Sequence, residues 1–212
     1  MKDAQGDSAY GRTNWRRFAV AVGVPTAVAG AIVVGIANGA LAASFSVSGQ
    51  SFKISADELD GTGFAQYGGQ DKKVDGTAIP VAVSGIHEAK LSNLCQSVVV
   101  PGTKLSLTIR AGREAGKEAE ATDLLIGMSE LSGDATFTNI NIGQDATTLT
   151  KGGDKAKLPA QATGYFGQEA DSVVITDLKQ TAYSTSAGTF KLTGLSLKVN
   201  LPNSDGSAVE CY

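Results

Sequence analysis

The stretch Lys104-Leu105-Ser106-Leu107-Thr108-Ile109-Arg110 alternates polar and apolar side chains without interruption. Such a period of two is typical of a β-strand with one buried face, because successive side chains of a strand point to opposite sides. The alternation places Leu105, Leu107 and Ile109 on one face. The stretch therefore predicts a strand and favours an all-β fold.

Shorter alternating pieces lie on both sides of this stretch, namely Phe45 with Val47, Phe52 with Ile54, Ile140 with Ile142, and Phe190 with Leu192. After Gly194 the alternation resumes on a shifted register, which predicts a strand interrupted by a β-bulge. Gly, Asp, Asn and Ser separate the pieces at short intervals, and longer polar breaks fall at 66–77, 111–122 and 150–163. Within the second break we interpret 113–120 as an exposed loop, because its glycines disfavour a helix.

Many short strands with glycine-rich turns predict one all-β domain. Three stretches, 54–64, 126–142 and 175–197, share a faint similarity in the order of their apolar residues, but their spacing varies too much for a true period. Two architectures therefore remain open. One is a β-solenoid or roll, and the other is an antiparallel sandwich or barrel.

A run of 26 uncharged residues, Phe18 to Ala43, precedes this domain, and the 17 residues before it carry a net charge of +2. The run exceeds the roughly 20 residues that cross a bilayer core as a helix, and positive charge keeps its near end in the cytoplasm. We therefore divide the chain into a cytoplasmic basic segment (1–17), a signal peptide or transmembrane helix (18–43), and an extracytoplasmic β-domain (44–212).

Ala40-Leu41-Ala42 has the small-x-small pattern of a signal cleavage site, with cleavage after Ala42. Two interpretations stay open. Cleavage would release a secreted domain, whereas an uncleaved N-terminal helix would hold the domain on the outer face of the cell membrane.

Two cysteines, Cys95 and Cys211, are present in the chain. In an oxidising compartment such a pair predicts a disulfide, which would tie down the C-terminal residues. After residue 43 the chain has 14 Lys and Arg against 19 Asp and Glu. This acidic balance argues against a nucleic-acid partner.

Residue patterns for catalysis and metal binding are weak. The segment 127–131 lacks the second glycine of a serine-hydrolase nucleophile elbow, and His87 is the only histidine, which we interpret as a surface residue. One histidine and two cysteines do not make a Cys/His zinc site. The carboxylates of 57–61 lack the ligand spacing of a calcium loop, so a solvated turn is the prediction there. No cofactor is expected.

Four aromatic residues flank glycines near predicted turns: Phe64, Tyr67, Tyr165 and Phe166. They are candidates for an interaction edge. The competing interpretation is that they pack against the core, as aromatic residues at strand ends commonly do.

Several segments together resemble one family, namely Gly39–Phe45, Gly63–Gly68, Leu94–Ser97, Gly133–Ile140, Gln168–Ile175, Ala187–Leu192 and Glu210–Tyr212. The family consists of actinobacterial proteins that are exported or membrane-anchored and whose function is not established. Some relatives carry the label cholesterol esterase. The resemblance implies a cell-envelope location and a small multi-helix membrane protein as a partner, and it supplies no catalytic residues.

These observations favour a non-enzymatic extracytoplasmic β-domain, anchored at or released from the membrane, with a structural or interaction role in the envelope. Self-association stays open. The alternatives are a lipid-ester hydrolase of the cholesterol esterase kind, and a carrier that encloses an apolar ligand.

Overall fold

The computed structural model describes residues 48–156 and 164–212, all within one compact unit. The basic segment 1–17, the apolar run 18–43 and the cleavage site after Ala42 lie outside the described residues. Within the described ranges no helix has both the length and the apolar character needed to cross a bilayer.

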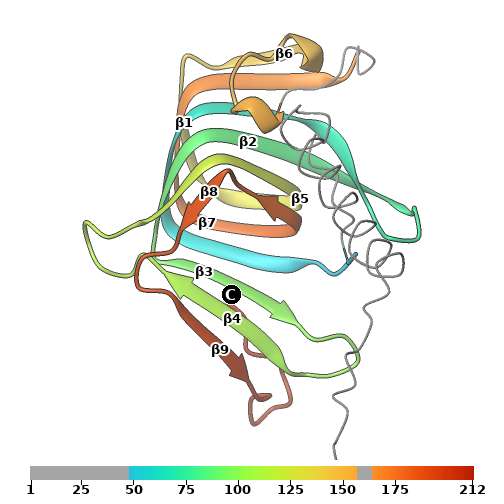
Figure 1. The fold of residues 1–212 in the computed structure, drawn as a ribbon, viewed down its shortest axis with the longest axis vertical. Helices are drawn as coiled ribbons and strands as arrows, with labels where there is room; N and C mark the ends of the chain where they lie inside the picture. The colour runs from blue at the N-terminus through green and yellow to red at the C-terminus, as the bar shows by residue number, and fades with distance from the viewer. Residues whose placement is uncertain (1–47, 157–163) are drawn as a thin grey trace, which may run out of the picture. The chain divides into compact units, whose positions relative to one another are not determined.

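The strands are β1 (Phe52–Lys72), β2 (Ala78–Ser92), β3 (Leu94–Val99), β4 (Ser106–Ala111), β5 (Ala119–Thr138), β6 (Asn141–Asp145), β7 (Phe166–Ser186), β8 (Thr189–Lys191) and β9 (Ser196–Asn200). Two short 3-10 helices, η1 (Ala146–Thr148) and η2 (Asp154–Ala156), complete the described elements. All nine strands pair antiparallel in one sheet (Figure 1). The predicted all-β class is confirmed.

Four of these strands are much longer than the short strands that the sequence predicts. β1, β5 and β7 contain 20 or 21 residues and β2 contains 15. β1 pairs with β2, β2 with β5, β5 with β7, and β7 with β1, so the four strands close a ring. β3 continues from β2 along the start of β1, and β4 and β9 extend the sheet from there.

Two lines of irregular residues cross this four-strand ring, and we call them creases. At the first crease the registers place Gly63 opposite His87 and Asp171, and His87 opposite Asp123. At the second crease they place Asp57 opposite Asn93 and Asp177, and Asp177 opposite Gly133. The long strands continue through these lines and bend strongly, as the ribbons of β1, β2 and β7 show in Figure 1.

The creases reveal a repeat in the chain. Seven-residue segments of one pattern occupy 57–63, 87–93, 117–123, 133–139, 171–177 and 188–194. In each segment the sixth residue is Ser or Thr and the seventh is Gly, Asn or Asp. The seventh residues, Gly63, Asn93, Asp123, Asn139, Asp177 and Gly194, all have positive φ, between 47° and 68°. They include every described non-glycine residue with positive φ.

The chemistry of this seventh position explains the bend. Glycine lacks the Cβ that disfavours left-handed backbone, and Asn and Asp tolerate that conformation better than other residues. One left-handed residue in a strand breaks the ladder locally and re-aims the chain. Glycine, asparagine and aspartate are also common where a strand ends in a turn. Sequence patterns therefore predict turns at these positions.

Inside the ring, the alternate side chains between the creases form the core. Leu59, Leu91, Val173 and Ile175 are at most 4% exposed, and they pack in one cluster with residues beyond the creases such as Leu178. Burial of such aliphatic side chains stabilises the fold by about 1.5–3 kcal/mol each. The ring is therefore filled by side chains of all four strands.

A second, smaller core lies where the segment carrying η1 and η2 packs against the ring. Ala65 and Tyr67 of β1 contact Ala146, Leu149 and Ala156 there. The buried carboxylate of Glu169 accepts hydrogen bonds from the backbone N–H groups of Thr150 and Lys151, at 2.7 and 3.1 Å. Charge-assisted bonds of this kind fasten the segment to β7.

The predicted bulge at Gly194 is wrong. β8 pairs with β5, whereas β9 pairs with β4. The alternation shifts because the chain turns at Gly194, with φ of 68°, and changes its partner strand. The predicted loop at 113–120 is confirmed up to Glu118, since a turn closed by a bond from Lys117 N to Glu114 O precedes β5.

Gly85 tests the second core. A Cβ at Gly85 would lie 2.4 Å from Ala156 Cβ and 2.6 Å from Gly152 O. We expect Gly85→Ala to lower the free energy of unfolding by about 1–3 kcal/mol, because overpacking forces backbone shifts. Denaturant titration measures this. In the control Gly68→Ala, a Cβ meets no atom within 4 Å, so equal losses in both variants would contradict the proposed close packing.

Tyr67 gives this core a pH dependence. Burial raises the pKa of Tyr67 from 10.0 to about 12. The neutral phenol therefore contributes stability that is complete below pH 10 and is lost as the pH rises toward about 12, because the unfolded chain ionises first. Tyr67→Phe should lose less stability than wild type between those pH values, by up to about 2–3 kcal/mol. Unfolding titrations across this range measure the difference.

Tyr165→Phe is the matched control for Tyr67→Phe, because the Tyr165 side chain is 55% exposed. It should follow the wild-type pH profile. A Tyr67→Phe profile identical to wild type would show that the phenol is solvated in the folded protein.

Candidate interaction surface

We call β3, β4 and β9 the outer sheet. Its register aligns Gln96, Ile109 and Leu197 in one row across the strands, and Val98, Leu107 and Val199 in the next. Because side chains in register share a face, these residues make one largely apolar face of the outer sheet. We call it the apolar face.

The apolar face is open to solvent along the edge strand. Leu195, Leu197, Val199 and Leu201 alternate along this part of the chain and are 56%, 61%, 64% and 77% exposed. Leu105, Leu107 and Ile109 beside them are half-buried. An exposed sheet face of this composition is uncommon in a soluble monomer, where apolar surface is normally scattered.

The opposite face of the outer sheet is polar and buried. Ser97, Ser106, Thr108 and Asn200 are at most 7% exposed. The predicted strand at Lys104–Arg110 is confirmed by β4, and its apolar side chains lie on the face that is not covered. The polar side chains of β4 are the buried ones, because residues 208–212, which we call the C-terminal segment, cover that side.

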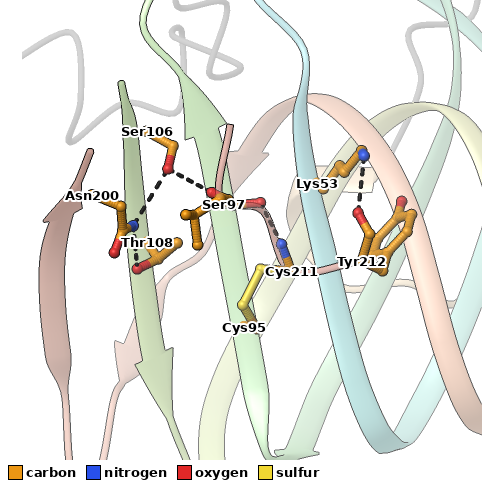
Figure 2. Close-up of a disulfide and its surroundings, with 9 residues drawn as sticks. Lys53, Cys95, Ser97, Ser106, Thr108, Asn200, Cys211 and Tyr212 are labelled. Atoms are coloured by element: carbon orange, nitrogen blue, oxygen red, sulfur yellow. Dashed lines mark hydrogen bonds between the residues drawn. A yellow bond between two sulfur atoms is a disulfide. The ribbon is translucent and has the colours of Figure 1, made fainter. Parts of the chain in front are cut away.

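Hydrogen bonds satisfy this buried polar face (Figure 2). Asn200 Nδ2 donates to Ser106 Oγ at 3.3 Å and to Thr108 Oγ1 at 3.1 Å. Ser106 Oγ donates to the Val209 carbonyl, and Cys211 N donates to Ser97 Oγ at 3.0 Å. Since buried polar groups without partners are costly, the C-terminal segment and the outer sheet depend on each other.

The predicted disulfide Cys95–Cys211 is confirmed and joins β3 to this segment. Next to it, Lys53 Nζ of β1 donates to Glu210 Oε2 at 3.2 Å and to the Tyr212 carbonyl at 3.0 Å. Lys53 and Lys179 lie 5.0 and 5.8 Å from the centre of the Tyr212 aromatic ring. The C-terminal residues are thus held on β1, β3, β4 and β7 together.

The four aromatic candidates from the sequence separate into two pairs. Phe64 is 4% exposed and lies 5.3 Å from the Phe137 ring, and Tyr67 is 6% exposed in the second core. Tyr165 and Phe166 are 55% and 59% exposed at the start of β7. Tyr67 is in register with Gly167, the residue that follows Phe166 in β7. Of these four aromatic residues, Tyr165 and Phe166 are the two that are exposed for contact with a partner.

His87 belongs to the first crease, where its Nδ1 lies 3.1 Å from Asp123 Oδ1. Two further pairs repeat this arrangement. Asn139 Nδ2 donates to Asp171 at 2.6 Å in the first crease, and Asn93 Nδ2 donates to Asp57 at 3.1 Å in the second. Each pair joins a left-handed residue to the regular residue opposite it, and His87 takes the regular position that Asp57 and Asp171 occupy in the other two pairs.

Charges also gather at the first crease. Lys151 forms an ion pair with Asp171, and hydrogen bonds from Lys151 and Asn139 lower the pKa of Asp171. Within 48–156 and 164–212, no group of three or more His, Cys, Asp or Glu side chains could hold a metal ion. The carboxylates of 57–61 lie in β1 and not in the predicted turn.

A small cavity of about 20 Å³ lies in the ring core. Leu94, Leu178 and Phe190 are among its apolar lining residues, and Gln180 and Thr185 also line it. Gln180 Nε2 and Thr185 Oγ1 are buried without hydrogen-bond partners in the structure. This volume has room for about one water molecule, which could bond both groups.

The disulfide gives a measurable prediction. Replacing both cysteines, Cys95→Ser with Cys211→Ser, should lower the free energy of unfolding by about 2–5 kcal/mol, because the bond spans 116 residues. Denaturant titration measures the change, and hydrogen exchange should show amide protection lost at 208–212. Glu210→Gln is the control, since loss of its partly exposed ion pair with Lys53 should cost less than about 1 kcal/mol. Equal losses would refute the role of the bond.

Comparison with known proteins assigns the chain to a family. No curated protein and no solved structure matches the chain. The family model described as a family of unknown function, DUF6230, matches residues 48–212, from the first described residue to the C-terminal segment. The match therefore covers the four-strand ring, the outer sheet and both cysteines. The chain belongs to this DUF6230 family of unknown function.

Proposed function

We propose that the chain is a non-enzymatic extracytoplasmic β-domain, anchored at or released from the membrane, that acts by contact through the apolar face of its outer sheet. The proposal rests on the burial of the two faces of the outer sheet, which is the reverse of the usual arrangement. Its polar face is buried under the C-terminal segment, and its leucine-rich face is exposed on an edge strand. Such a face is typical of a protein or membrane contact.

An extracytoplasmic location is supported by the disulfide and by the run 18–43. Disulfides persist in oxidising compartments and are rare in reducing cytosol. Cys95–Cys211 closes a large loop and leaves no free cysteine among the described residues. An apolar run after a basic segment is the arrangement that exports or anchors such a domain.

A non-enzymatic role is supported by the place of His87 in the first crease. The lipid-ester hydrolase alternative would need this histidine as the base for a nucleophile. Its Nδ1 is already paired with Asp123, and within the described ranges no hydroxyl group hydrogen-bonds to the imidazole. The two Asn–Asp pairs at equivalent positions favour the structural role.

The carrier alternative has one observation in its favour, the core cavity with the unpartnered groups of Gln180 and Thr185. A volume of about 20 Å³ is far below the several hundred Å³ of most ligand pockets. A carrier role would therefore require the ring to open. Lipid co-purified with the full chain would support this alternative.

Location is tested by placing single reporter cysteines in the full chain. Val74→Cys lies at an 86% exposed position in the β1–β2 turn. We expect a membrane-impermeant maleimide to label it on intact cells of the native host, or in their medium if the domain is released. Labelling of Val74→Cys only after lysis would contradict the proposal.

Ser8→Cys is the matched control, because segment 1–17 is predicted to be cytoplasmic. In an uncleaved protein it should be labelled only after the cells are broken. The N-terminal sequence of the labelled protein separates cleavage after Ala42 from an uncleaved anchor.

A further inference from the structure

The outer sheet cannot bury its apolar face by exchanging it with the polar face. The opposite side is fixed by the Cys95–Cys211 bond and by the hydrogen bonds of Ser97, Ser106 and Asn200. Among the strands of 48–156 and 164–212, β9 pairs with β4 alone and is therefore an edge strand. Leu197 and its exposed neighbours therefore face either water or a second surface.

The outer sheet carries a charge that the rest of the domain does not share. The ranges 94–111 and 195–201 contain Lys104, Arg110 and Lys198 and no Asp or Glu. Residues 44–212 as a whole have 14 basic against 19 acidic side chains. Lys104, Arg110 and Lys198 alternate with the apolar residues, so they lie on the polar side of the outer sheet, where Lys198 is in register with Thr108. No acidic side chain of these two ranges opposes contact between the apolar face and a bilayer surface, where exposed aliphatic groups enter the interface.

Chain length limits how far this surface can be from a membrane. Eight residues, 44–51, separate the run 18–43 from Phe52, the first residue of β1. Eight residues reach at most about 28 Å when fully extended. The start of β1 lies beside the outer sheet, because Lys53 pairs with Ser97 of β3. An uncleaved anchor would thus keep the outer sheet within reach of the lipid headgroups.

We propose that the apolar face of the outer sheet docks on the lipid bilayer that holds the chain, with Leu197, Val199 and Leu201 in the interface. This inference rests on the proposed function and names its contact partner. It applies to the anchored form of the chain. The domain then lies on the membrane and does not extend freely from it.

The test uses a tryptophan reporter in the full chain reconstituted in vesicles. Trp15 is the only native tryptophan, so Trp15→Phe gives a silent background for Leu197→Trp. We expect the Leu197→Trp emission to shift to the blue and to be quenched by phospholipids brominated on their acyl chains.

Val74→Trp in the same background is the matched control. Val74 is exposed and apolar like Leu197 but lies in the β1–β2 turn. Its emission should stay red and unquenched. Val199→Trp, on the same face and 64% exposed, repeats the test if Leu197→Trp folds poorly.

Three outcomes would overturn the inference. Leu197→Trp and Val199→Trp could both remain red and unquenched, they could be quenched no more than Val74→Trp, or they could turn blue without lipid quenching, which means a protein partner or second copy. In each case the location experiment still stands for the proposed function, if Val74→Cys is labelled from outside. Labelling of Val74→Cys only after lysis would instead refute the proposed function itself.

Discussion

The left-handed residues at the creases are the constraint on which the rest of the fold depends. A strand of about 20 residues would extend about 65 Å if it stayed straight, which is far too long for a core of this size. Gly63, Asp123 and Asp177 bend β1, β5 and β7 without ending them. Because the bends fall in register, the strands turn together and the ring can close around Leu59, Val173 and their neighbours.

A second constraint decides which face the outer sheet presents. The chain returns at residues 208–212 to lie on the polar side of β3 and β4, where Cys211 bonds to Cys95. Ser106, Thr108 and Asn200 then find partners that water would otherwise supply. With that side occupied, the leucines of β4 and β9 are left on the open side, so a covalent bond on one face sets the character of the other.

The creases also change how His87 is understood. A histidine bound to an aspartate suggests general-base chemistry when the pair is viewed alone. Viewed beside Asn139–Asp171 and Asn93–Asp57, it is one of three cross-strand pairs that join a left-handed residue to its regular neighbour. Lys151 adds an ion pair at the same line. The repetition favours a structural function, which a single pair could not have shown.

Much of the secondary structure could be predicted from local pattern. The alternation at Lys104–Arg110 identified a strand, the glycines of 113–120 identified a loop, and the two cysteines identified their bond. The length of β1 could not be predicted, because residues such as Asp57 and Gly63 occur both where a strand ends in a turn and where it bends and continues. The signal that was missed is the six-fold recurrence of a seven-residue segment that ends in Ser or Thr followed by Gly, Asn or Asp.

By itself the sequence determined that the domain is all-β, where its side chains alternate, and which cysteines join, since these follow from local spacing and from chemistry. Only the tertiary structure decided that the strands run through their apparent breaks, that Phe64 and Tyr67 are buried while Tyr165 and Phe166 are exposed, and that β4 turns its leucines outward. Alternation defines two faces of a strand but not which one is covered. That choice was made by the C-terminal segment, about 100 residues further along the chain.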